Sequence, residues 1–331
     1  MTATSSAAPE AAHSHATFAG VICGAGAGAL WGLVFLAPEL VRTFDPLFLT
    51  SGRYLFYGLI SAAMLAPRWR HFAATVSAGE WLALMKLGFT GNILYYLLLS
   101  TAVQSGGVAM TSLVIGFLPV AVTIVGSRDK GAVSLAKLAP SLLLCAAGAI
   151  CIGWQTVAAP SQIPASARLT GLLSAIGALV SWTIYAVSNS RWLRRLDHIS
   201  AHDWNFLTGV VTGAQSLVLI PLAFLIDHAH HDAAEWTQLG LVSLGVAFLA
   251  SIVGNALWNR MSRLLPLTLT GQMILFETLF ALIYGFLWER RMPHALEAAA
   301  FTLVALSVVS CVGAHRNAGA QGQTADAAHP I

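Results

Sequence analysis

The chain has 331 residues, of which 57% are hydrophobic and only 9% are charged. Soluble proteins carry about 25% charged residues, so this composition excludes an ordinary soluble domain and favours a protein that exposes its helices to lipid. The net charge of +3 is too small to indicate nucleic acid as a partner.

Ten apolar stretches follow one another along the chain. Each has about twenty residues, enough for a helix to cross a hydrocarbon layer of about 30 Å. The predicted spans are residues 18–37, 47–66, 80–100, 107–126, 135–156, 168–190, 203–226, 236–258, 267–287 and 294–314. Because the connections are short, we predict an all-α membrane protein with ten transmembrane helices and no soluble domain.

The basic residues of the connections are divided unevenly between the two sides of the membrane. With the N-terminus inside, eleven Lys and Arg residues lie in cytoplasmic segments and four lie in outside loops. Since basic residues accumulate in cytoplasmic loops, both termini are predicted to be cytoplasmic. The end segments 1–17 and 315–331 lie outside the apolar spans and are predicted to be disordered cytoplasmic tails.

The last five spans repeat features of the first five in the same order. Gly91-Asn92-Ile93-Leu94-Tyr95 in the third span matches Gly254-Asn255-Ala256-Leu257-Trp258 in the eighth, and Trp31-Gly32 in the first matches Trp182-Thr183 in the sixth. Because five is odd, the second copy enters the membrane from the opposite side, which is the inverted repeat of many secondary transporters. The predicted units are a first repeat at 18–156, an outer linker at 157–167 and a second, inverted repeat at 168–314.

Small residues recur at every fourth position of the first span, at Gly24, Gly28 and Gly32. Such a ridge lets two helix backbones approach closely inside a membrane. We therefore predict a close helix contact along this face.

Two charged residues inside predicted spans are candidates for function. Glu277 is about midway along the ninth span, where a carboxylate is costly unless it is paired, solvated or neutral. It could bind a substrate ammonium or exchange a proton, or it could be a protonated acid bonded to a neighbouring helix. Arg53 lies two turns inside the second span, where its guanidinium could pair with a substrate carboxylate or extend outward to cap loop carbonyls.

Aromatic and amide side chains suggest a shared central cavity. Helical spacing is expected to place Asn92, Tyr95 and Tyr96 on one face of the third span and Trp182 and Tyr185 on one face of the sixth. Polar faces of a spanning helix have to point at protein or water, and aromatic rings with a few polar groups suit an amphipathic zwitterion. Anchoring at the membrane interface is the alternative. The candidate substrate-binding residues are Trp31, Arg53, Asn92, Tyr95, Tyr96, Trp182, Tyr185, Gln215, Gln272 and Glu277.

Other chemistries have weaker support. The longest outer loop contains Asp227, His228, His230, His231 and Asp232, which could hold a metal, although a solvated loop is the preferred interpretation. The four cysteines fall within spans without CxxC spacing and are interpreted as packing residues. Zinc-protease, nucleophile-elbow and Walker A motifs do not occur, so we predict neither an enzyme nor an ATP-driven pump, and expect no catalytic residue, metal or cofactor.

Several short motifs together resemble the drug/metabolite transporter superfamily, in particular its EamA-type ten-helix members. The motifs are Ala29-Leu30-Trp31-Gly32, Asp45-Pro46 before Arg53, Phe117-Leu118-Pro119-Val120, Phe276-Glu277-Thr278 and Trp288-Glu289-Arg290. The resemblance covers about residues 18–314 and is greatest to the YddG-type aromatic amino-acid exporters of bacterial inner membranes. In the commonest family pattern Glu precedes Pro in the fourth and ninth spans, whereas Leu118-Pro119 here lacks the Glu and Glu277-Thr278 lacks the Pro.

The resemblance implies export by a secondary transporter. We predict a multi-pass bacterial inner-membrane protein that exports aromatic and other apolar amino acids by alternating access. The predicted partners are these small molecules and membrane lipid, with no nucleic acid, and the predicted state is a monomer. The alternative is a drug or metabolite exporter of the same fold, and proton coupling and facilitated export both stay open.

Overall fold

The computed structural model describes residues 7–106, 111, 114–128, 133–158, 164–290, 292–293 and 295–327. Every regular element within these residues is helical, which confirms the all-α prediction. Seven helical segments are long and apolar enough to cross a membrane: Ala16–Leu40, Ala78–Gly106, Ser166–Arg195, Ala201–Ile226, Ala233–Leu264, Leu267–Tyr284 and Ala298–His315. Leu135–Cys151 is a shorter apolar helix. Part of the predicted span 107–126 lies outside the described residues.

The helices follow one another along the chain with short connections. The first half contains α1 (Ala7–Gly32), η1 (Leu33–Phe35), α2 (Ala37–Leu40), α3 (Pro46–Leu65), η2 (Ala66–Arg68), α4 (Trp69–Thr75), α5 (Ala78–Gly88), η3 (Phe89–Leu94), α6 (Tyr95–Gly106), α8 (Leu118–Gly126) and α9 (Leu135–Ala158). The second half contains α10 (Ala165–Arg195), α11 (Ala201–Ile226), α12 (Ala233–Val246), η4 (Ala247–Gly254), α13 (Asn255–Leu264), α14 (Leu267–Met273), α15 (Leu275–Glu289) and α16 (Ala295–Ala327).

Several helix starts follow directly from their capping residues. The Asp45 carboxylate accepts a hydrogen bond from the Leu47 amide at 2.8 Å, and Pro46 occupies the first position of α3. Ser77 and Glu80 form a reciprocal capping box at the start of α5. Such caps satisfy amides that have no partner inside the helix.

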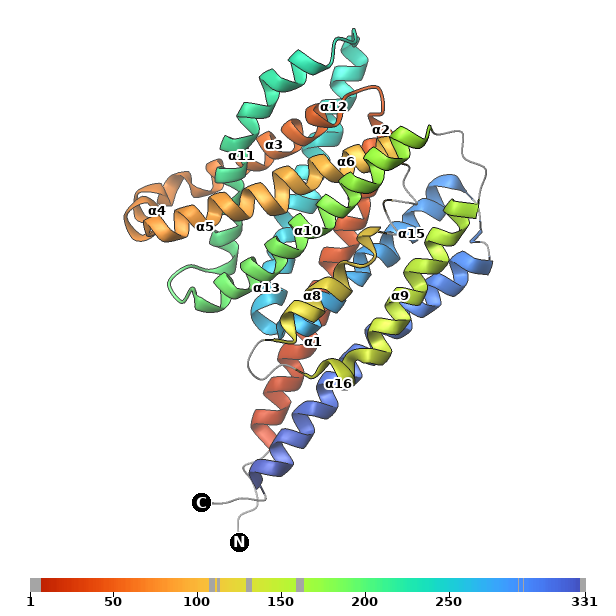
Figure 1. Ribbon diagram of the computed structural model, residues 1–331. Helices are drawn as coiled ribbons and strands as arrows, with labels where there is room; N and C mark the ends of the chain where they lie inside the picture. Colours follow the sequence, from red (N-terminus) through yellow and green to blue (C-terminus); the bar gives the residue numbers. More distant parts are fainter. Residues whose placement is uncertain are drawn as a thin grey trace.

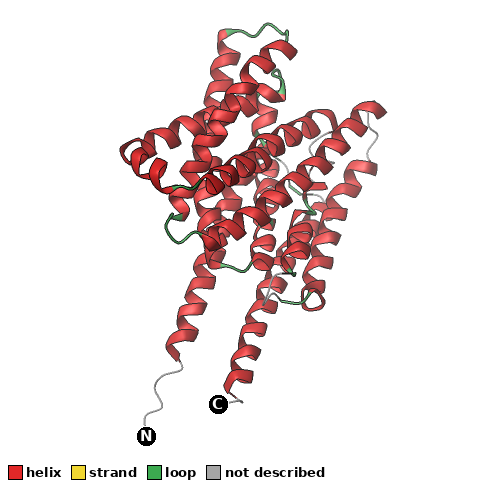
Figure 2. Cartoon of the chain, turned by 60° about the vertical axis from the view of Figure 1, so that its left-hand side comes forward, coloured by secondary structure: helices red, strands yellow, loops and turns green. Residues whose placement is uncertain are grey.

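The two terminal helices extend beyond the predicted spans. α1 begins at Ala7 and α16 runs to Ala327. Alanine is frequent in both segments and has the highest helix propensity, which extends each helix beyond its apolar stretch. Both ends of the chain lie at the same end of the molecule (Figures 1 and 2).

The two halves are interleaved. α1 packs against η4, α13 and α15 of the second half, and α10 packs against η3 and α6 of the first. α3 packs along α11, and α9 lies beside α16, as Figure 1 shows on the right of the molecule. Each half therefore depends on the other for much of its buried surface.

The predicted close contact is confirmed for all three glycines, with Gly24 facing Met261 and Met273 and the other two at the crossing of α1 with α15. A Cβ atom at Gly28 would lie 2.5 Å from Phe276 Cβ and 2.7 Å from the Glu277 backbone nitrogen. One turn later, a Cβ at Gly32 would lie 2.9 Å from the Ala281 backbone nitrogen. These distances are too short for any side chain, so the glycines set the position of Glu277 in the molecule.

Candidate functional site

The third and eighth predicted spans both change from an α-helix to a π-helix near their middle. η3 contains Gly91-Asn92, and η4 ends immediately before Asn255. Each π-helix accepts a hydrogen bond from the other half: Trp31 Nε1 donates to the Ala250 carbonyl at 3.1 Å, and Ser181 Oγ donates to the Thr90 carbonyl at 2.7 Å. Short π-helices of this kind are frequent at functional sites.

Five buried rings meet between these two segments. We call Trp31, Tyr95, Trp182, Tyr185 and Trp258 the aromatic cluster. Trp182 is central, with ring centroids 5.8 Å from Trp31, 6.2 Å from Tyr95, 5.8 Å from Tyr185 and 5.3 Å from Trp258. Trp31 and Trp258 are 5.1 Å apart. The rings come from α1, α6, α10 and α13, so the cluster joins both halves.

Trp258 is the member of the cluster that the sequence analysis did not select. Its position was nevertheless visible there, because the repeat places Trp258 where the third span has Tyr95. Both rings contact Trp182. The repeat pattern was therefore the signal that could have identified it.

Arg53 is a buried cation beside this region. Arg53 is only 5% exposed, and its Nε donates a hydrogen bond to Ser251 Oγ of η4 at 3.1 Å. Its Cζ lies 4.3 Å from the Tyr96 ring centroid and 5.0 Å from that of Tyr54, which are cation–π distances. Within the described residues no carboxylate lies within 4.0 Å of the guanidinium.

Buried hydroxyl groups lie near Arg53. Tyr96 interacts with Arg53 and with Ser100, which lies one turn further along α6. Thr50 precedes Arg53 by one turn on α3, and its buried hydroxyl has no hydrogen-bond partner within the described residues. A buried polar group without a partner costs about 1–3 kcal/mol, so this hydroxyl beside a cation is suited to binding a polar ligand.

Glu277 provides a buried carboxyl group. It lies in the first turn of α15, and it interacts electrostatically with Arg53 without forming an ion pair. Tyr95 lies within electrostatic range of both side chains. The arrangement therefore combines a guanidinium, a carboxyl group and an aromatic cluster in one buried region.

The family model described as the EamA-like transporter family matches residues 18–157 and again residues 169–312. The chain belongs to this family. It is 32% identical over 316 residues to the inner membrane protein YtfF of Escherichia coli, covering 89% of this chain and 95% of YtfF. It is 26% identical over 286 residues to the uncharacterized transporter YdeK of Bacillus subtilis, covering 83% and 89%.

A solved crystal structure has the same fold. It superimposes with a TM-score of 0.68 over 90% of this chain and 98% of the other, at 18% identity. These comparisons identify the chain as a multi-pass inner-membrane transporter of the EamA type and not an enzyme. The family model matches once in each half, and each match contains one of the two π-helices.

The three amide side chains predicted to bind substrate form hydrogen bonds with other groups of this EamA transporter. Asn92 Nδ2 donates to Thr212 Oγ1 at 3.1 Å, and Gln215 Nε2 donates to the Met85 carbonyl at 2.9 Å. Gln272 lies in a different polar group, bonded to Thr123, Ser141 and Ser307. These three amides join helices and do not contact the aromatic cluster through the bonds described.

The three predicted residues of the third span contact three different helices. Asn92 contacts α11, Tyr95 contacts Trp182 on α10, and Tyr96 contacts Arg53 on α3. Because α3 and α11 pack against each other, Asn92 and Tyr96 meet the same helix pair. Tyr96 therefore belongs to the Arg53 environment and Tyr95 to the aromatic cluster.

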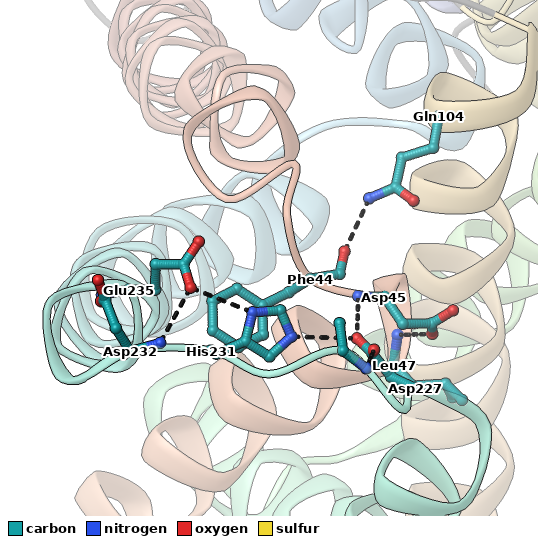
Figure 3. A network of polar contacts seen from close by, with 9 residues as sticks. Phe44, Asp45, Leu47, Gln104, Asp227, His231, Asp232 and Glu235 are labelled. Carbon is teal, nitrogen blue, oxygen red and sulfur yellow. Dashed lines mark hydrogen bonds and ion pairs between the residues drawn. The ribbon is translucent and has the colours of Figure 1, made fainter.

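The histidine-containing loop of this EamA transporter forms a polar network at the end opposite the termini. Figure 3 shows His231 between two carboxylates, with Nε2 3.4 Å from Asp227 Oδ2 and Nδ1 3.4 Å from Glu235 Oε2. The ring stacks on Phe44 at 3.8 Å, and the Asp45 amide donates to Asp227 Oδ2 at 3.1 Å. The His231 side chain is only 4% exposed, so the interpretation as a solvated loop is wrong at this residue.

The same network bears on the metal alternative. Across the described residues, no group of three or more His, Cys, Asp or Glu is arranged to hold a metal ion. The contacts instead connect the segment between α2 and α3 to the segment between α11 and α12. The network therefore links the two halves at this end of the molecule.

Asp227→Asn is expected to reduce the loss of folding stability that acidification causes. Burial raises the pKa of Asp227, but hydrogen bonds from the Ala229 and Asp45 amides and from His231 outweigh it and lower the pKa below its ordinary value. The ionised carboxylate therefore stabilises the folded state above the unfolded pKa of about 4, and this contribution is lost as pH falls through the folded pKa.

Thermal unfolding in detergent between neutral and acid pH measures this effect. We expect Asp227→Asn to lower stability by about 1 kcal/mol at neutral pH and the difference to vanish in acid. Glu39→Gln is the control, because its ion pair with Arg42 at 3.2 Å is exposed and contributes little. Parallel curves for the parent and Asp227→Asn over the whole pH range would contradict the assignment.

Proposed function

We propose that the chain exports amino acids with aromatic and other apolar side chains, as the YddG-type members of its superfamily do. The observation that carries this proposal is the buried Arg53 guanidinium with no carboxylate in ion-pair distance among the described residues, close to a buried Glu277 and an aromatic cluster. A buried charge is costly unless a partner compensates it. A zwitterionic amino acid supplies a carboxylate for Arg53, an ammonium for Glu277 and a ring for the cluster.

The proposed mechanism is alternating access by two five-helix halves arranged as inverted repeats. It is supported by the double match to one family model, by a π-helix within each match and by termini at one end of the molecule. The excess of basic residues in the segments on the same side as the termini supports a cytoplasmic location for both ends. In this proposal the chain works as a monomer, because the site is built within one chain.

Counterflow of labelled phenylalanine into proteoliposomes tests the proposed cargo. We expect accumulation that unlabelled aromatic amino acids suppress and a cationic dye does not. An organic cation is the second candidate, because Glu277 and the aromatic rings also suit a positive charge next to π faces. Dye transport by folded protein with no phenylalanine accumulation would assign the chain to that class.

A further inference from the structure

The indole nitrogen of Trp258 is a donor in the aromatic cluster without a partner among the described residues. Trp258 is 1% exposed and contacts both Trp31 and Trp182. Its Nε1 finds no hydrogen-bond acceptor among the described residues. A buried N–H without an acceptor loses the hydrogen bond it makes with water in the unfolded chain, so such groups are rare in folded proteins.

Two other buried indoles of the chain are satisfied. Trp31 Nε1 donates to the Ala250 carbonyl at 3.1 Å, and Trp204 Nε1 donates to Asn189 Oδ1 at 3.0 Å. The fold thus provides acceptors for these indoles and leaves Trp258 without one inside the candidate site. Trp258 Nε1 is therefore a buried donor with which a bound molecule could pair.

The distance from Arg53 indicates which part of that molecule meets Trp258. Arg53 is bonded to Ser251, and Trp258 follows Ser251 by seven residues on the same span, about 10 Å along a helix axis. Tyr95 connects the two places, because it contacts the same Trp182 ring as Trp258 and lies within electrostatic range of Arg53. An aromatic amino acid with its carboxylate on Arg53 would extend its ring toward Trp258.

We propose that the Trp258 Nε1–H donates a hydrogen bond to a hydroxyl oxygen on the substrate ring, so that Trp258 selects tyrosine over phenylalanine. This inference rests on the proposed amino-acid cargo. Phenylalanine fills the same space but leaves the donor unpaired. A site that binds a ring hydroxyl discriminates against the analogue without it, because the buried donor then has no partner.

Binding of tyrosine and of phenylalanine to the purified protein, each measured with the parent and with Trp258→Phe, tests the proposal. We expect the parent to prefer tyrosine by about tenfold, the usual effect of one neutral hydrogen bond, and the variant to lose that preference while still binding phenylalanine. Trp204→Phe is the matched control, since it removes an indole N–H outside the cluster. It should lower thermal stability and keep the parent's preference.

The other outcomes separate the two proposals. Equal binding of both amino acids by the parent overturns the role of Trp258 and leaves the cargo intact, whereas binding of neither overturns the cargo. An equal loss of both affinities in Trp258→Phe indicates ring packing or a carboxylate contact and also overturns the role. If Trp258→Phe does not fold, replacing Trp258 by 3-benzothienylalanine removes only the N–H and keeps the outline of the ring.

Discussion

Arg53→Gln is expected to reduce phenylalanine affinity and counterflow by about 100-fold, because hydrogen bonds to a charged group contribute about 1.5–3 kcal/mol and each 1.4 kcal/mol is a factor of ten. The guanidinium is buried, held by Ser251 and by the rings of Tyr54 and Tyr96, and within the described residues has no carboxylate at ion-pair distance. A neutral amide cannot replace its two parallel donors toward a carboxylate.

Phenethylamine, which has the ring and ammonium of phenylalanine but no carboxylate, makes this test specific. The parent should bind phenylalanine more tightly than phenethylamine, and Arg53→Gln should abolish that difference. Ser251→Ala is the control, since it removes one hydrogen bond to Nε and leaves the charge in place. Parental counterflow by Arg53→Gln, or an equal loss of both ligands, would show that Arg53 does not bind the carboxylate.

Gly28→Leu is expected to prevent α1 from packing against α15. The Cβ atom alone would lie 2.7 Å from the Glu277 backbone nitrogen, and a backbone atom cannot move aside as a side-chain end can. Overpacking in a well-packed interior usually costs about 1–3 kcal/mol, and a branched side chain against backbone should reach or exceed the upper value. The measurements are the yield of monodisperse protein in detergent and its unfolding temperature.

Gly240→Leu provides the comparison for this substitution. A Cβ at Gly240 has no neighbour within 4 Å, so leucine there meets open space within the same kind of apolar helix. We expect Gly240→Leu to be folded at the parental yield. Equal behaviour of the two variants would mean that the α1–α15 crossing is not a close contact in the protein.

Much of the fold could be predicted because membrane spans have a strong signal in single sequences. A run of about twenty apolar residues has few other structural solutions, and the fourth-residue glycines of α1 have a direct geometric meaning. The ends of the terminal helices were less predictable, because alanine favours a helix from Ala7 onward although this segment lies outside the apolar span. Where a helix ends was thus less visible in the sequence than where it crosses the membrane.

The candidate site was less predictable because it depends on backbone register and on partners far away in the chain. Helical spacing relates Asn92 to Tyr95, but it does not indicate that the Asn92 amide bonds to Thr212 on α11. Gln272 looked like a cavity residue, yet its partners lie on α8, α9 and α16. The burial of His231 between Asp227 and Glu235 depends on Phe44, which no local pattern connects to that loop.

The interleaving of the halves also constrains how the chain is assembled during synthesis. Trp31 donates to a carbonyl 219 residues later in the chain, and Tyr284 donates back to the Ala29 carbonyl across 255 residues. During synthesis the glycine ridge of α1 therefore contacts only lipid or the insertion machinery until α13 and α15 have been made. We therefore expect the bundle to be completed late in biogenesis, because a ribosome stalled before α15 would leave α1 without the helix that packs against Gly28 and Gly32.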